Sequence, residues 1–378
     1  MAENKDKKVL NVPNLRFPEF EGEWQEERLS DIADLSKGIG ISKDQLSADG
    51  EPCILYGELY TKYKSETIKE VISKTNIDNT KLVKSKANDV IIPCSGETAE
   101  EIATARCVLK DDVLLGGDLN IIRLHVYDGS FMSYQLNGKR KYDIAKVAQG
   151  VSVVHLYGEH LKNIKTINPS LNEQKKIANL LSLLDDRIST QNKIIEKLQS
   201  LIKGIAHRIS KQDKSNIRLS ECLQCSSSTL QESDVAEVGS YPVYGANGVV
   251  GYLDTYNTTD EAIYIIKDGS GVGSVSYING KCSATGTLNI LQAKDGFSLR
   301  YLYFMLKVFS FEPYKTGMAI PHIYFKDYGK AKIFCPPYEL QNKYADLLSK
   351  IEQKAIAEQK ILDNLCSQKQ YLLRQMFI

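Results

Sequence analysis

Few residues in this 378-residue sequence combine the types and spacing that bond-making chemistry requires. Cys222 and Cys225 form the one CxxC pair, and no second CxxC or HxxxH follows at a usable distance. A zinc site needs about four ligands, so this pair is short of two. The five histidines are too scattered for a metal cluster, and no Ser/His/Asp or Cys/His arrangement stands out. We therefore expect neither a metal site nor a catalytic residue.

Two segments resemble motifs of enzymes but lack the decisive residue. Residues 267–273, Lys-Asp-Gly-Ser-Gly-Val-Gly, miss the Lys-Ser/Thr pair of a P-loop and precede strand-like rather than helix-like residues. They form either a structural turn or a loop that presents backbone amides and Ser270 to a ligand. Residues 335–338, Cys-Pro-Pro-Tyr, resemble the Asn/Asp-Pro-Pro-Tyr motif of amino-directed DNA methyltransferases. Cysteine cannot replace the amide or carboxylate that accepts from the target amino group, so we interpret the prolines as a hinge before a helix.

The formal charge of +1, from 48 Lys+Arg against 47 Asp+Glu, excludes a protein that holds nucleic acid by bulk positive charge. Basic and aromatic residues nevertheless gather locally in residues 60–86, 137–146 and 300–332. This pattern fits phosphate contact and base-edge readout, although a solvated charged face has the same composition. The candidate DNA contacts are Tyr60, Lys62, Tyr63, Lys64, Ser95, Lys139, Arg140, Lys141, Tyr244, Asn247, Lys267, Ser270, Lys315 and Tyr324.

The elements that must position these residues are duplicated. An offset of 167 aligns residues 150–205 with residues 317–372 without a gap. A weaker echo joins residues 28–31 to residues 218–221, so each half starts and ends with the same element. The offset also aligns His155 with His322, and we interpret these two histidines more readily as structural residues than as ligand contacts. Identical pairs under the offset include Gly150/Gly317, His155/His322, Tyr157/Tyr324, Pro169/Pro336 and Gln174/Gln341.

The shared ending of each half reads as a long helix. After Pro169 apolar residues recur in alternating steps of four and three, a heptad seam that predicts a helix over about 173–210. At 1.5 Å per residue this helix is about 57 Å long. Gln191 and Glu358 fill the same polar layer, either as devices that fix the register or as tolerated polar residues. We expect the two helices to pack on each other, within one chain or across a dimer. The predicted seam is Ile177, Leu181, Leu184, Ile188, Gln191, Leu198, Leu348, Ile351, Glu358, Leu362 and Leu365.

These patterns predict an α+β protein with two globular mixed α/β domains, separated by two long antiparallel coiled-coil helices and related by a pseudo-twofold internal repeat. The scattered cysteines suit reduced thiols in the cytoplasm. No apolar run reaches the roughly 18 residues of a membrane span, and residues 1–8 lack the apolar core of a secretory signal. The predicted segments are a first domain with its N-terminal segment (1–165), a central helix (166–212), a second domain (213–332) and a C-terminal helix (333–378).

Taken together, the sequence resembles the specificity subunits of type I restriction–modification systems over nearly its whole length. The first half lacks the Tyr-Gly-Ala-Asn-Gly string and has Tyr56-Gly57-Glu58-Leu59-Tyr60 where a comparable element would lie, which leaves the DNA-contacting loops of the first domain open. The resemblance rests on residues 11–24 (Asn-Val-Pro-Asn-Leu-Arg-Phe-Pro-Glu-Phe-Glu-Gly-Glu-Trp), 172–177 (Asn-Glu-Gln-Lys-Lys-Ile), 244–248 (Tyr-Gly-Ala-Asn-Gly) and 316–322 (Thr-Gly-Met-Ala-Ile-Pro-His).

The resemblance implies a subunit without catalytic activity that reads double-stranded DNA. Each recognition domain would bind one half of a bipartite site, and the helices would set the spacer and dock two modification subunits. S-adenosylmethionine would be held by the modification subunits, and ATP and Mg²⁺ by the restriction subunits, with no cofactor in this chain. Two alternatives come from other classes: a divergent DNA methyltransferase or nucleotide hydrolase, and a coiled-coil scaffold without a DNA role.

Overall fold

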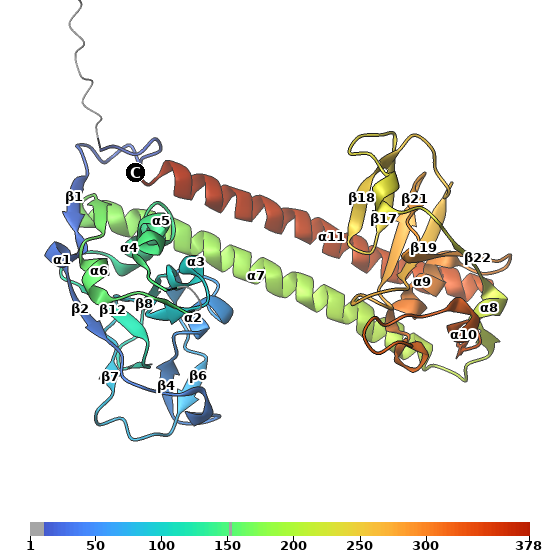
Figure 1. Ribbon diagram of the computed structural model, residues 1–378, viewed down its shortest axis with the longest axis horizontal. Coiled ribbons are helices and arrows are strands. Elements are labelled where there is room, and N and C mark those ends of the chain that lie inside the picture. Colours follow the sequence, from blue (N-terminus) through green and yellow to red (C-terminus); the bar gives the residue numbers. More distant parts are fainter. Residues whose placement is uncertain (1–10, 151–152) are drawn as a thin grey trace, which may run out of the picture. The chain divides into compact units, whose positions relative to one another are not determined.

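The computed structural model describes residues 11–150 and 153–378, so the predicted polar N-terminal segment 1–8 lies outside the described residues (Figure 1). Contacts between residues divide the chain into two units. One unit joins the chain up to Thr190 with Ile361–Ile378, and the other comprises Gln191–Lys360. Each unit therefore contains one globular part and a piece of each long helix, and each is described below by itself.

The globular part of the first unit is built on two five-stranded sheets. Their strand orders are β2-β12-β8-β10-β5 and β3-β6-β4-β11-β7, and two further pairs are β1-β14 and β9-β13. Every residue of β8 is buried, and α4 packs against β8 and β10. The elements are β1 (Gln25–Arg28), α1 (Leu29–Ile32), β2 (Ala33–Lys37), β3 (Leu46–Ser47), β4 (Glu51–Ile54), α2 (Glu58–Thr61), β5 (Thr67–Ile68), β6 (Ser73–Thr75), β7 (Val83–Lys84), β8 (Asp89–Pro93), β9 (Ser95–Gly96), α3 (Ala99–Ile102), β10 (Arg106–Val108), β11 (Leu114–Leu115), β12 (Leu119–Leu124), α4 (Gly129–Asn137), α5 (Lys141–Val147), β13 (Val154–His155), α6 (Gly158–Lys162) and β14 (Lys165–Asn168).

The globular part of the second unit has a simpler version of the same plan. Its sheets have the orders β16-β22-β19-β20 and β18-β17-β21, with β15 paired to β23, and α9 covers β19, β20 and β22. The elements are β15 (Ile217–Arg218), α8 (Leu219–Cys222), β16 (Leu223–Ser227), β17 (Tyr241–Gly245), β18 (Gly248–Leu253), β19 (Glu261–Ile266), β20 (Val275–Asn279), β21 (Ser283–Ala284), β22 (Leu288–Ala293), α9 (Leu299–Val308), α10 (Phe325–Tyr328) and β23 (Lys332–Ile333).

One difference between the two globular parts follows from the motif that the first half lacks. In the second half β17 and β18 form the hairpin that the Asn-Gly pair predicts, with Gly245 opposite Gly248, and Gly248 has a φ of +105°. In the first half the chain after Tyr56-Gly57 turns into the short helix α2 instead. The two globular parts therefore differ at this loop.

Two long helices, α7 (Leu171–Ser210) and α11 (Tyr338–Gln375), run antiparallel in both units. In the first unit Ile177 of α7 shares a core cluster with Met376, beyond the end of α11. In the second, the Gln191 amide donates to the Glu358 carbonyl oxygen at 3.0 Å and also to its carboxylate. Every predicted seam residue is buried or half-buried. The predicted α+β class, with two mixed domains, paired long helices and an internal repeat, is thus confirmed.

The repeat is visible in how each half is closed. The strand that opens each half pairs antiparallel with the strand that precedes its long helix: β1 with β14, and β15 with β23. The short helices α1 and α8 that follow carry the same capping interaction, from the Arg28 N–H to Asp31 and from the Arg218 N–H to Glu221. The weak sequence echo between the two starts is therefore a shared structural element.

A buried glutamine at the start of each long helix ties the helix to its globular part. The Gln174 amide donates to the Pro169 carbonyl oxygen at 2.8 Å and accepts from the Asp128 N–H, at the start of α4, at 2.9 Å. Gln341 makes the same two bonds, to the Pro336 oxygen at 2.8 Å and from the Ser298 N–H, at the start of α9, at 2.9 Å. The prolines do lie just before the helices, as the sequence predicts.

Candidate nucleic-acid interface

In the second unit a seven-residue hairpin loop lies beside the glycine-rich connection. Thr316 and His322 exchange both backbone hydrogen bonds, at 2.9 and 2.7 Å, which closes the loop. The Ile323 N–H donates to the Lys267 carbonyl oxygen at 2.9 Å, and the Gly269 N–H donates to the Pro321 oxygen at 3.0 Å. Gly317 has a φ of +88°, and a Cβ there would lie 2.4 Å from the Ile320 oxygen, so the loop requires glycine at this position. We call residues 316–322 the second hairpin loop.

A histidine and a tyrosine form the base of this loop. His322 Nδ1 lies 2.6 Å from Asp268 Oδ1. The His322 ring stacks on Tyr324 with 6.5 Å between ring centroids, and the Lys326 ammonium lies 5.3 Å from the Tyr324 centroid. His322 is about one-third exposed, so its Nδ1 bond to Asp268 leaves part of the ring open to solvent. This arrangement offers a nitrogen donor and an aromatic face to a bound molecule.

In the first unit Gln149 and His155 pair in the same way as Thr316 and His322. Gln149 and His155 exchange backbone hydrogen bonds at 2.9 and 2.7 Å. His155 Nδ1 lies 3.3 Å from the Ser95 hydroxyl, and its ring stacks on Tyr157 at 6.2 Å. The Lys37 ammonium lies 5.6 Å from the Tyr157 centroid. Both halves thus carry a histidine, a stacked tyrosine and a lysine over that tyrosine, whereas the partner of the histidine is Ser95 in one and Asp268 in the other.

Apolar side chains are exposed near both histidines. Met318 of the second hairpin loop is fully exposed, and Ile320 is more than half exposed. Val153, two residues before His155, is half exposed, and the tyrosines that stack on the histidines, Tyr157 and Tyr324, are nearly so. These side chains are open to contact with a bound molecule.

The structure brings together the predicted contacts of the second half. Lys267 and Ser270 lie in the glycine-rich connection, and Lys315 and Tyr324 flank the second hairpin loop that this connection pairs with. Tyr244 and Asn247 belong to the separate hairpin of β17 and β18. Asn247 is exposed at its turn, whereas the Tyr244 ring packs edge-on against Tyr264 at 5.9 Å.

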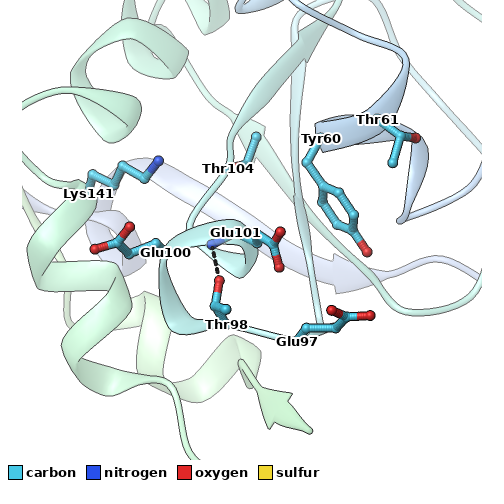
Figure 2. Close-up of a pocket in the computed structure, with 8 residues that line it drawn as sticks. All are labelled: Tyr60, Thr61, Glu97, Thr98, Glu100, Glu101, Thr104 and Lys141. Carbon is cyan, nitrogen blue, oxygen red and sulfur yellow. Dashed lines mark hydrogen bonds between the residues drawn. The ribbon is translucent and has the colours of Figure 1, made fainter. Parts of the chain in front are cut away.

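In the first half the structure brings Tyr60 and Lys141 into one pocket of about 600 Å³. Figure 2 shows the Tyr60 ring beside the carboxylates of Glu97 and Glu101, with Glu100 on the side of Lys141. Burial, helped by the nearby carboxylates, raises the pKa of Tyr60, so its hydroxyl stays protonated. Three carboxylates against one lysine make this pocket a poor site for phosphate. They can instead accept hydrogen bonds from amino groups.

The other predicted contacts of the first half are scattered. Tyr63 is a core residue at 7% exposure, with its hydroxyl bonded by the Ile72 N–H, so it does not belong to a surface site. The Lys62 ammonium is paired with Glu58 at 2.5 Å, and Arg140 is bonded to Asp143 at 3.4 Å. Lys64 and Lys139 are exposed, and Ser95 lies against His155.

Sequence reasoning placed neither histidine among the candidate contacts, and it missed Tyr157 and Asp268. Each histidine does have a hydrogen-bonding partner, as a structural histidine should. The available signal was the identity of His155 with His322 and of Tyr157 with Tyr324 under the offset of 167. What the sequence did not show is that each histidine lies against the loop after a central strand.

Within residues 11–150 and 153–378, no cluster of three or more metal-ligating side chains occurs, and no helix is long and apolar enough to cross a bilayer. Burial raises the pKa of Cys222 to about 12 and that of Cys225 to about 11, so neither is a thiolate at neutral pH.

Comparisons with known proteins agree on one family. A family model described as the type I restriction modification DNA specificity domain matches residues 21–200 and again residues 212–366. A putative type I specificity subunit of Mycoplasma genitalium is 25% identical over 287 residues, which cover 68% of this chain and 73% of that protein. The specificity subunit of the type I restriction enzyme MjaVIII of Methanocaldococcus jannaschii is 27% identical over 205 residues, 54% of this chain and 45% of that protein.

Solved structures show the same fold. A crystal structure of a type I restriction–modification S subunit from M. genitalium superposes with a TM-score of 0.69 at 21% identity and covers 97% of this chain and 99% of that one. A chain from a study of complex assembly and conformational transition of the type I system superposes with a TM-score of 0.52 at 15% identity, covering 94% and 97%. The two matches of the family model correspond to the two halves of the repeat.

Proposed function

The chain belongs to the family of type I restriction–modification specificity subunits, and on that premise we propose that it recognises a bipartite site in double-stranded DNA without catalysing a reaction itself. Each globular part binds one half of the site. The paired helices α7 and α11 set the number of unspecified base pairs between the halves. At 1.5 Å per residue each helix is about 60 Å long, which bounds the spacer at roughly 17 base pairs between domain centres.

The observation that carries this proposal is a histidine, with a tyrosine stacked on it, that occurs in both globular parts at equivalent positions. Two domains that read different bases must still hold the same sugar–phosphate backbone. Features common to both halves are therefore candidates for backbone contact, and features that differ are candidates for base readout. His155 and His322, with Tyr157 and Tyr324, are common, whereas Ser95 and Asp268 differ.

In the second half the side chains suit a DNA backbone. Lys267 supplies positive charge near the second hairpin loop. The Lys315 ammonium also lies there, paired with Glu312 at 2.5 Å, so it has to leave this carboxylate to bind a phosphate. Asp268 holds the His322 ring through Nδ1, which leaves Nε2 available for a hydrogen bond with DNA. Asn247, exposed at the turn of the neighbouring hairpin, is placed to read a base edge, since its amide both donates and accepts.

In the first half the carboxylate-lined pocket suits bases better than phosphates. Glu97, Glu100 and Glu101 repel the backbone but accept from the exocyclic amino groups of cytosine or adenine in the major groove. Lys64 and Lys139 are exposed and remain candidates for phosphate contact, with Tyr60 and Lys141 at the pocket. Because Tyr63 is buried, it has no part in this interface.

The partners follow from the family. We propose that the paired helices dock two modification subunits that carry S-adenosylmethionine and methylate adenine, and that restriction subunits with ATP and Mg²⁺ complete the complex in the cytoplasm. The structural relative from a study of complex assembly of the type I system supports an assembly of this kind. This chain then needs no cofactor of its own.

Methylome sequencing of a host with and without this chain tests the proposal. We expect one bipartite adenine-methylated motif to disappear when the chain is deleted and to return when it is supplied. An unchanged methylome contradicts the proposal and favours a coiled-coil scaffold. Binding of S-adenosylmethionine or ATP by the purified chain alone would instead favour the alternative of a divergent methyltransferase or nucleotide hydrolase.

A further inference from the structure

A buried group of charges in the first unit joins both long helices to the first globular part. The Lys369 ammonium of α11 lies 2.6 Å from Glu66 and 2.6 Å from Asp185 of α7. The three side chains are only 15%, 12% and 6% exposed. Asp185 also accepts from the hydroxyl of Tyr134 at 2.8 Å and from that of Ser65 at 2.9 Å. Arg106, itself buried, adds a second positive charge that acts on both carboxylates. We call Glu66, Asp185, Arg106 and Lys369 the charge cluster.

The charge cluster is balanced only because Lys369 is present. Glu66 and Asp185 contribute two negative charges, and Lys369 and Arg106 two positive ones. Burial raises the pKa of Glu66, while Lys369 acts in the opposite direction and favours the carboxylate. Removing one member of a buried group of this kind leaves an uncompensated charge in a low-dielectric environment, which is strongly destabilising.

The positions equivalent to Asp185 and Lys369 have different partners in the second unit. Under the offset of 167 Asp185 corresponds to Glu352, and Lys369 corresponds to Ile202. Glu352 takes its positive partners from α9 of its own globular part: Arg300 bonds to it, and the Lys307 ammonium lies 3.7 Å away. Ile202 is buried in the apolar core. In this half the facing long helix therefore contributes a hydrophobic side chain and no charge.

This asymmetry matters because α7 and α11 are copies of one another. A second copy of the chain could lay its α7 along α7, or its α11 along α11, in the same antiparallel manner. Pairing α7 with α7 puts Ile202 of the second copy where Lys369 belongs, and leaves Glu66 and Asp185 against Arg106 alone. Pairing α11 with α11 brings Lys369 of the second copy to Glu352, which already has two positive partners. When a helix pairs with its own copy, the buried site therefore carries one more uncompensated charge than it does when α7 pairs with α11.

We propose that Lys369 and Ile202 form a pairing code, by which the two halves of this chain bind each other in preference to the same half of a second copy. The code acts by excluding the wrong partner, since like pairing leaves buried charges uncompensated while α7 with α11 does not. This role is separate from DNA recognition. It also explains why Lys369, rather than an apolar residue, occupies the position equivalent to Ile202 in the helix pair.

Two variants of the full chain test the code. Ile202→Lys with Lys369→Ile exchanges the two residues, so that α7 with α7 becomes the balanced pairing. Glu66→Gln with Lys369→Met leaves one negative charge, on Asp185, and one positive charge, on Arg106. These charges balance in either pairing, because the facing helix then contributes either the methionine that replaces Lys369 or Ile202, and no charge. Each variant and the wild type are co-expressed as two differently tagged copies. Co-capture through one tag, molar mass by light scattering and melting temperature are then measured, with Lys369→Met alone as the control that is unbalanced in either pairing.

We expect the exchanged variant to double its molar mass and to raise co-capture at least about tenfold over the wild type. The Glu66→Gln, Lys369→Met variant should melt at a higher temperature than Lys369→Met alone. Its co-capture should lie between that of the wild type and that of the exchanged variant. If both variants fold and keep the mass and co-capture of the wild type, the proposal is overturned. If the exchanged variant does not fold, the Glu66→Gln, Lys369→Met chain decides. Its failure to fold would also overturn the proposal, which requires charge balance rather than Lys369 itself. The proposal of DNA recognition is tested separately, by the methylome with the wild-type chain, and does not depend on the outcome of this experiment.

Discussion

Replacing Gln174 by alanine tests how the recognition domains are held on the helices. The Gln174 side chain is almost fully buried and satisfies two backbone groups, the Pro169 carbonyl oxygen at 2.8 Å and the Asp128 N–H at 2.9 Å. A buried backbone group left without a partner costs roughly 1–3 kcal/mol, and a net hydrogen bond from a partly buried one contributes roughly 0.5–1.5 kcal/mol. We therefore expect Gln174→Ala to lower the free energy of unfolding by about 2–4 kcal/mol.

The assay is urea denaturation followed by circular dichroism, with hydrogen exchange of the α4 amides to locate the effect. Gln174→Glu still accepts from the Asp128 N–H but sets a buried carboxylate against the Pro169 oxygen, and it should lose at least as much. Gln341→Ala removes the equivalent pair of bonds in the second unit and should destabilise α9 rather than α4. A Gln174→Ala chain within about 0.5 kcal/mol of the wild type, with unchanged exchange in α4, would refute the reasoning.

Three further predictions concern the seam and the loops. Hydrogen bonds from Lys354 and Gln191 lower the pKa of Glu358 below its ordinary 4.5, so the stability that this carboxylate gives is present above pH 4.5 and is lost as the pH falls. Unfolding midpoints of Glu358→Gln should therefore decline less steeply than those of the wild type below that pH, and parallel curves would contradict this. His322→Ala should weaken DNA binding by the assembled complex for all sequences alike, whereas a changed motif would show that His322 reads a base. Inserting one heptad after Ile188, with a matching heptad after Lys360 so that Gln191 and Glu358 stay paired, should lengthen the methylated motif's spacer by about 3 base pairs and leave both half-sites intact.

The long helices could be predicted from the sequence because their signal is local and repeated. A heptad seam identifies its own buried face, and the offset of 167 shows that both copies share the polar layer of Gln191 and Glu358. The hairpin at Asn247 was predictable for the same reason, since its turn residues are adjacent in the sequence.

The sites depend on contacts between distant residues, which no local pattern shows. Asp268 and His322 meet across 54 positions, and Glu66 and Lys369 across 303. Tyr63 shows the opposite error: a tyrosine among lysines suggested a surface contact, but the chain turns its ring into the core. Counting charges in a segment does not reveal which side chains point outward.

Exchange of the second recognition domain tests the central claim most directly. The segment 213–332 is replaced by the corresponding segment of a relative with a different methylated motif, and the methylome of the host is sequenced. Our account predicts that one half of the motif changes to that of the relative, while the other half and the spacer stay the same. An unchanged motif, or a change in both halves, would contradict the conclusion that each globular part reads its own half-site.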